Sequence, residues 1–150
     1  MDAEKNTRSA MENNIILQVG VKALLQNSEG KYLLLRRSLE KYPEIKGRWD
    51  IVGGRIDPGS ILIENLRREI KEETNLELIG EPKLIAAQDI RPKPDKHIVR
   101  LTYIGKVNGQ IKVDKSENDS YKWYSAQELK NIDDLDIYFK ELLDKNLINV

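Results

Sequence analysis

The feature that most constrains this chain is a glycine-bearing loop, residues 53–60, that runs directly into an amphipathic segment, residues 61–74. The segment contains no glycine or proline, and its apolar residues recur at the spacing of one helix face. These apolar residues are Leu62, Ile63, Leu66 and Ile70. The sequence therefore predicts a helix that buries one face and begins beside a loop whose backbone can approach a ligand closely.

Three glutamates, Glu69, Glu72 and Glu73, occupy one edge of the apolar stripe of this helix. A carboxylate near a core edge is costly unless it is paired or binds a metal ion. Acids three or four residues apart also repel one another by about 0.2–0.5 kcal/mol per pair. A bound cation removes both penalties, and clustered carboxylate oxygens select Mg²⁺ or Mn²⁺. The alternative is a set of solvated charges, in which Arg68 pairs with Glu72 across one helical turn.

The two ends of the helix carry residues with capping preferences. Ser60 is a natural N-cap for a helix that starts at Ile61, and Asn75 stands where a left-handed residue would end it. The loop is not a P-loop, because no Gly-Lys-Ser/Thr closes it, and it lacks the G-x-G-x-x-G spacing of a dinucleotide site. An ordinary connection between a strand and a helix is the remaining alternative.

Residues 54–76 resemble the Nudix box, whose family pattern is G-x5-E-x7-R-E-U-x-E-E-x-G-U, with U a bulky aliphatic residue. The positions that match in register are Gly54, Arg68, Glu69, Ile70, Glu72, Glu73 and Leu76. Ser60 stands where the pattern has its first Glu, and Asn75 stands where it has Gly. Flanking features extend the resemblance, namely Trp49, the pair Glu117 and Trp123, and the S-x-x-E-L stretch at 125–129.

The resemblance implies a fold and a reaction. The fold is of the α/β class, a Nudix-type α/β/α sandwich with a mixed sheet between helices in a single domain. The reaction is divalent-metal-dependent hydrolysis of the pyrophosphate linkage of a nucleoside diphosphate linked to another group, X. The expected substrate is a normal or oxidised nucleoside triphosphate.

There are three alternatives to this substrate and reaction. ADP-ribose or another nucleotide sugar is the second choice, because Pro92 lies sixteen residues after Leu76, a spacing found in ADP-ribose-cleaving relatives. A nucleotide-binding module without hydrolysis is the third, with Ser60 as its one argument. An isopentenyl-diphosphate isomerase is disfavoured because the chain has no cysteine.

The resemblance also implies roles for individual residues. The metal ligands would be the carboxylates of Glu69, Glu72 and Glu73 and the carbonyl of Gly53. Arg68 would orient one of these glutamates, and the base that activates water would be Glu73 or Glu117. We further expect substrate contacts from charged and aromatic side chains near the loop, namely Arg36, Arg37, Arg55 and Trp49. The single histidine, His97, is expected to be structural.

Composition argues against several other classes of function. The 150 residues include 25 basic and 25 acidic side chains, so net charge favours neither a nucleic acid polymer nor a membrane as partner. The absence of cysteine excludes thiol catalysis and cysteine zinc sites. No apolar run reaches the ~18 residues of a membrane span, and residues 1–14 do not resemble a signal peptide. We expect a cytoplasmic protein with a small-molecule nucleotide as partner, and the resemblance adds a homodimer as an option.

The remaining pattern predicts a flexible tail over 1–13 and one domain over 14–150. Strands are expected over 15–26, 32–37, 49–52, 76–90 and 97–107, with a turn at 27–30 and loops at 38–48 and 91–96. Asn108-Gly109 predicts a hairpin that pairs 97–107 with 110–113. The last helical region is expected over 132–147.

Overall fold

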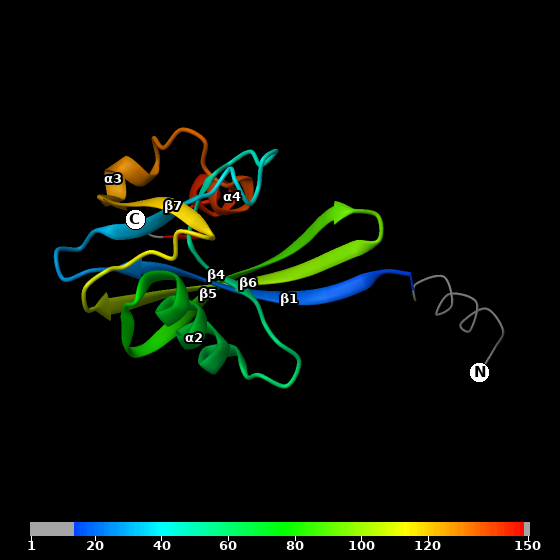
Figure 1. Ribbon diagram of the computed structural model, residues 1–150, viewed down its shortest axis with the longest axis horizontal. Helices are drawn as coiled ribbons and strands as arrows, with labels where there is room; N and C mark the ends of the chain where they lie inside the picture. Colours follow the sequence, from blue (N-terminus) through cyan, green and yellow to red (C-terminus); the bar gives the residue numbers. More distant parts are fainter. Residues whose placement is uncertain (1–13, 149–150) are drawn as a thin grey trace.

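A seven-stranded mixed sheet forms the middle layer of the protein in residues 14–148, which the computed structural model describes. Helix α2 lies on one side of the sheet, and α3 and α4 lie on the other (Figure 1). The strands are β1 (Ile16–Gln26), β2 (Tyr32–Arg37), β3 (Trp49–Asp50), β4 (Val52–Arg55), β5 (Glu77–Lys93), β6 (Lys96–Asn108) and β7 (Asn118–Tyr124). The helices are α2 (Leu62–Thr74), α3 (Ala126–Leu129) and α4 (Ile137–Asp144). The predicted α/β/α sandwich is confirmed.

Strand β1 is the centre of the sheet. It pairs in parallel with β6 from Ile16 to Gln26, and it pairs antiparallel with β2 and β4 on its other side. In the β1–β4 pairing Lys22 is opposite Gly53 and Val21 is opposite Gly54. Because side chains alternate along a strand, this register fixes which β1 residues lie beneath the glycine loop.

Two hydrophobic cores lie on the two faces of the sheet. The core beneath α2 contains Val21, Leu33, Leu66, Ile70 and Tyr103 among others. The core beneath α3 and α4 contains Leu24, Leu34, Leu129, Phe139 and Leu142 among others. The second half of β1 and residues 32–35 of β2 are largely buried on both faces, which explains why these stretches are mostly apolar.

Four predicted segments differ from the structure. Residues 91–93 extend β5 instead of forming a loop, and the turn to β6 is only Pro94-Asp95. Residues 110–113 form no strand, and the Lys112 amide instead donates to the Thr74 carbonyl at the end of α2. The strand predicted over 49–52 is divided at Ile51 into β3 and β4, and the helix predicted over 132–147 covers only Ile137–Asp144.

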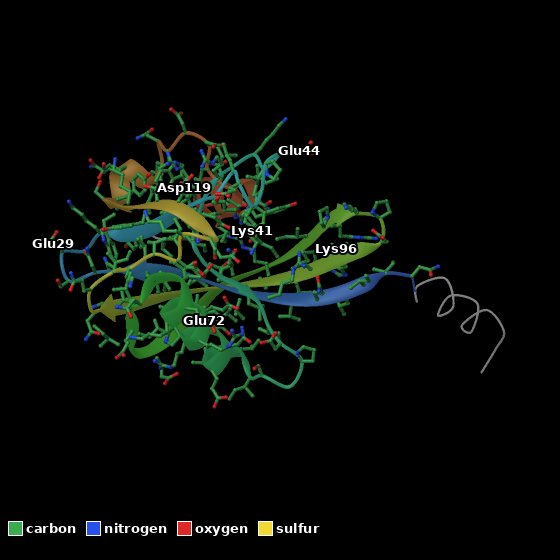
Figure 2. The ribbon with its side chains drawn as sticks, viewed as in Figure 1. Glu29, Lys41, Glu44, Glu72, Lys96 and Asp119 are labelled. Carbon is green, nitrogen blue, oxygen red and sulfur yellow. The ribbon has the colours of Figure 1, made fainter. Side chains whose placement is uncertain are left out.

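The start of β1 and the hairpin of β5 and β6 project beyond the helices as an arm (Figure 1). Lys96 lies near its outer end (Figure 2). None of the helices in the described part of the chain is long and apolar enough to cross a membrane. The tail predicted over 1–13 lies outside the described residues.

Candidate active site

A cavity of about 540 Å³ opens between α2, β4 and the loops at 38–48 and 110–117. Three glutamates of α2 line one side, and the other sides carry both acidic and cationic side chains and one tyrosine. The lining includes Lys22, Arg37, Tyr42, Asp50, Gly53, Gly54, Arg55, Glu69, Glu72, Glu73, Asp114 and Glu117. Most of the predicted site residues therefore meet in one cavity, although they come from segments far apart in the sequence.

Helix α2 directs its acidic edge at the glycine pair. Its apolar stripe is anchored by the fully buried Leu66 and Ile70. This anchoring turns Glu69 and Glu73, one helical turn apart, toward β4. The Gly53 amide donates to the Glu73 carboxylate at 3.0 Å. The helix and the glycine strand thus form two facing walls of the cavity.

The packing of β4 requires glycine at position 53 and leaves little room for a side chain at position 54. A Cβ at Gly53 would lie 2.1 Å from the Val21 carbonyl oxygen, and its φ of +138° is rarely adopted by other residues. A Cβ at Gly54 would lie 3.2 Å from the Glu69 carboxylate. The glycine pair therefore allows the helix carboxylates to approach the backbone of β4.

Burial changes the acidity of the two inner glutamates. Burial raises the pKa of Glu73 from the ordinary 4.5 to about 7, although nearby Lys22 lowers it in part. Burial also raises the pKa of Glu69, and Arg68 opposes this shift. Both side chains therefore pay a desolvation penalty when charged, which is the penalty that a cation would remove.

Glu72 and Arg68 form the outer edge of the carboxylate group. Glu72 is exposed on α2 (Figure 2) and accepts from Arg68 at 3.1 Å. Arg68 also donates to Asp57 at 2.9 Å and to Glu69 at 3.5 Å. In residues 14–148 no three acidic or histidine side chains converge as a ready metal cage. The donor set, three carboxylates beside the Gly53 carbonyl, nevertheless has the oxygen chemistry that hard divalent cations require.

Glu117, the other predicted base, lines the cavity from the loop that precedes β7. It pairs with Lys41, and it accepts from the Tyr42 hydroxyl at 2.9 Å. These contacts of Glu117 connect the loop at 38–48 to the loop at 110–117 beside the cavity. Tyr42 was not singled out from the sequence, because nothing in its neighbourhood distinguishes it from other loop tyrosines.

The four predicted substrate contacts divide into two pairs. Arg37 and Arg55 line the cavity. Arg36 and Trp49 do not: Arg36 pairs with Asp119 at 2.7 Å, and its guanidinium lies 5.7 Å from the Trp49 ring centre. Trp49 packs edge-on against Tyr124 and lines a separate groove beside α3. Outside the cavity, His97 contacts Asp89 at 2.8 Å.

A buried ionic cluster beneath the cavity was missed in the sequence. It consists of Lys22, Arg37, Asp50, Arg100 and Asp136. Lys22 and Arg100 each interrupt an apolar strand, and a charge in such a run is seldom buried without a partner. That interruption is the signal from which the cluster could have been inferred. The partners of Lys22 and Arg100 come from other elements, so the sequence could not have identified them.

The box predicted from the sequence occupies α2 and its two ends. Asn75 ends the helix in the left-handed conformation, with φ of 64°, as predicted. The prediction for Ser60 is wrong: the helix starts one residue later, the N-cap is Ile61, and no side chain caps it. A family profile described as the NUDIX domain matches residues 16–145. This chain belongs to the Nudix family of hydrolases.

Known Nudix relatives agree with this assignment in sequence and in fold. The chain is 30% identical over 122 residues to the nucleoside triphosphatase NudI of Klebsiella pneumoniae (strain 342), and the match covers 73% of this chain and 83% of the relative. It is 31% identical over 127 residues to NudI of Escherichia coli (strain K12), with the same coverage. The fold matches the MutT protein of Methanosarcina mazei Go1 with a TM-score of 0.72, at 26% identity over 87% of this chain and 93% of that protein. Nudix hydrolases generally use divalent metals.

Proposed function

We propose that this Nudix hydrolase cleaves the pyrophosphate linkage of nucleoside triphosphates, normal or oxidised, with Mg²⁺ or Mn²⁺. The observation that carries the proposal is the position of two half-buried helix glutamates, Glu69 and Glu73, beside the glycine strand β4. Both line a cavity whose walls also contain the cationic side chains of Lys22, Arg37 and Arg55. A cavity that contains both carboxylates and cationic side chains suits a metal-bound polyphosphate. The carboxylates can bind metal ions, and the cationic side chains can neutralise phosphate charge. The relatives named nucleoside triphosphatase support the same substrate class.

The proposed metal ligands are Glu69, Glu72, Glu73 and the Gly53 carbonyl. A bound divalent metal would supply charge stabilisation and a more acidic water for attack at phosphorus. Glu72 has to exchange its ion pair with Arg68 for this role, and Arg68 can retain its bonds to Asp57 and Glu69. Arg68 would thus keep the Glu69 carboxylate oriented by a charge-assisted hydrogen bond.

Two carboxylates are candidates for the proton acceptor. Glu73 has a pKa of about 7 through burial, which suits proton transfer near neutral pH. Glu117 faces the same cavity from the opposite loop, and its bonds to Lys41 and Tyr42 fix its position. Glu117→Gln distinguishes them: if Glu117 is the base, turnover falls about 100-fold or more while the dissociation constant for Mn²⁺ stays unchanged.

A second hollow of about 300 Å³ adjoins the cavity and suits the nucleoside. Its walls include Ile90, Pro92, Ile98 and Tyr138, and it shares Arg37 and Arg55, among others, with the carboxylate cavity. Apolar and aromatic walls are typical of small-molecule sites, and charged residues of this hollow, among them Arg100 and Asp136, can supply polar contacts. Because Pro92 lines this hollow, ADP-ribose is the second candidate substrate.

The test is release of phosphate and pyrophosphate from nucleoside triphosphates, oxidised analogues, dinucleoside polyphosphates and ADP-ribose, with Mg²⁺, Mn²⁺ or EDTA. We expect metal-dependent turnover of triphosphates that Glu72→Gln and Glu73→Gln each reduce by orders of magnitude. Preferred cleavage of ADP-ribose would select the second candidate. Metal and nucleotide binding without turnover of any compound would point to a binding module. A cytoplasmic location and a homodimer stay predictions.

A further inference from the structure

The ionic cluster beneath the cavity contains more positive than negative charge. Its cations are Lys22, Arg37 and Arg100, and its anions are Asp50 and Asp136. Arg100 bridges the two carboxylates, at 3.0 Å to each. Lys22 and Arg37 share one oxygen of Asp50, and Arg37 also lies 3.9 Å from the other carboxylate, Asp136. One cationic charge is therefore without an anion inside the cluster.

The excess charge faces the cavity. The Lys22 and Arg37 side chains are 13% and 25% exposed, whereas Arg100 is 6% exposed and lies deeper. Lys22 and Arg37 line both the carboxylate cavity and the adjoining hollow. They therefore occupy the junction through which a ligand that fills both spaces must pass.

One N–H donor of the Lys22 ammonium group makes only a weak hydrogen bond. An ammonium group has three N–H donors, and two of them are engaged at 3.0 Å, by the Asp50 carboxylate and the Ile51 carbonyl. The third reaches the Gly53 carbonyl only at 3.5 Å, a marginal distance for a hydrogen bond. The Gly53 carbonyl is also a proposed metal ligand, so a metal bound there would leave this donor free beside it.

We propose that Lys22 is a substrate-binding residue, which donates its third N–H to a phosphate oxygen of the polyphosphate at the junction of the two hollows. This inference rests on the proposed function, because it takes a metal-bound polyphosphate as the ligand. Lys22 and a bound metal would then both contact the polyphosphate beside the Gly53 carbonyl. The strand pairing of Lys22 with Gly53 fixes the distance between the lysine and the glycine loop.

The test compares wild type with Lys22→Met, Lys22→Arg and the control Lys106→Met. Lys106 is an exposed strand lysine on β6, outside both hollows. Calorimetry measures the binding of Mn²⁺ alone and of inorganic pyrophosphate with Mg²⁺, and thermal unfolding monitors the fold. Loss of one charge-assisted hydrogen bond should weaken pyrophosphate binding by Lys22→Met roughly 10–100-fold. The affinity for Mn²⁺ should stay within about threefold, and Lys22→Arg should recover most of the pyrophosphate binding.

Each other result overturns the assignment in a distinguishable way. Equal pyrophosphate binding by wild type and Lys22→Met excludes contact with the phosphate. A parallel loss of Mn²⁺ and pyrophosphate affinity makes Lys22 a support of the glycine loop instead. If Lys22→Met does not fold, Lys22→Arg is the deciding variant, because it retains the positive charge. A folded Lys22→Arg protein that binds pyrophosphate weakly would contradict the proposal that the charge at this position binds phosphate. A wild-type protein that binds no pyrophosphate with Mg²⁺ would overturn the proposed function as well.

Discussion

Glu73, a proposed metal ligand and candidate base, has an electrostatic position that disfavours its charged form. Its carboxylate is held beside β4 by the Gly53 amide, and burial raises its pKa to about 7. Since the folded-state pKa lies above the ordinary value of 4.5, the folded protein binds the extra proton between these two pH values. Stability of the metal-free protein should therefore fall as pH rises from about 4.5 to about 7.

Glu73→Gln should remove this loss of stability. At pH 8 and without metal, the variant should be more stable than wild type by on the order of 1–3 kcal/mol. At pH 4 the two should be nearly equal, because Glu73 is then protonated and neutral in both the folded and unfolded wild type. Urea unfolding at both pH values, with EDTA, measures the difference. A variant that is less stable at pH 8 would mean that ionised Glu73 is well compensated in the metal-free fold.

The same proton should compete with the metal. Because a carboxylate must be ionised to bind a cation, the Mn²⁺ dissociation constant should rise up to about tenfold per pH unit as pH falls below 7. Titrations with Mn²⁺ between pH 5.5 and 8, with Glu117→Gln as the matched carboxamide control, would measure this slope. A dissociation constant independent of pH over that range would exclude Glu73 as a ligand.

Residue-level inference from the sequence succeeded where the determining neighbours are local. The edge position of Glu69 and Glu73 follows from helical periodicity alone, and the structure places both facing the glycine strand. Lys22 and Asp50 are different. Their contacts join residues 28 positions apart, and the register of β1 against β4, which no local pattern specifies, brings them together. Arg36 and Trp49 lie outside the cavity for a related reason, since alternation sends Arg36 and Arg37 to opposite faces of β2.

At the scale of elements, helix α2 begins without a stabilising side-chain cap. The N-cap Ile61 makes no side-chain cap and is 62% exposed. Ile61→Ser should supply the missing acceptor and stabilise the protein by about 1 kcal/mol, or about 2–4 °C in Tm. Ser60→Ala is the control and should change stability by less than about 0.5 kcal/mol, since Ser60 is not the cap. Calorimetry measures both, and turnover should be unchanged in Ile61→Ser. Destabilisation by Ile61→Ser would show that the contacts of the isoleucine outweigh a cap.

The sequence predicted the bounds of helices and strands better than it predicted which strands pair with each other. Strand β2 has the predicted bounds, and the helix of the box differs by one residue at its start. Asn108-Gly109 predicted a hairpin, but Gly109 instead starts a loop in which Lys112 donates to the end of α2. The strand β6 already has β1 and β5 as its two neighbours, so no edge is left for residues 110–113. This competition among strands is a property of the sheet and cannot be read from a turn.

At the scale of the whole molecule, the ionic cluster links β3, β6 and α4, which also meet in the core beneath α3 and α4. Asp50 belongs to β3, Arg100 to β6, and Asp136 caps α4 by accepting from the amides of Tyr138 and Phe139. Burial alone would raise the pKa of Asp50, but the charges of Arg100, Lys22 and Arg37 outweigh it and hold the pKa well below its ordinary value. The folded-state pKa is therefore depressed. Its stabilising contribution is present above about pH 4 and is lost as pH falls further.

Arg100→Met should expose how much the molecule depends on this cluster. The substitution leaves two buried carboxylates with fewer cations and should cost about 3–5 kcal/mol in the free energy of unfolding at pH 7. Arg67→Met is the matched control, because Arg67 pairs with the exposed Glu81 at 3.4 Å, and it should cost less than about 1 kcal/mol. Denaturant unfolding at pH 7 and at pH 3.5 measures both variants. The gap between Arg100→Met and wild type should narrow at pH 3.5, because protonation of Asp50 then relieves the unpaired charge in the variant. If Arg100→Met and Arg67→Met were equally stable at pH 7, the two cores alone would hold β3, β6 and α4 together.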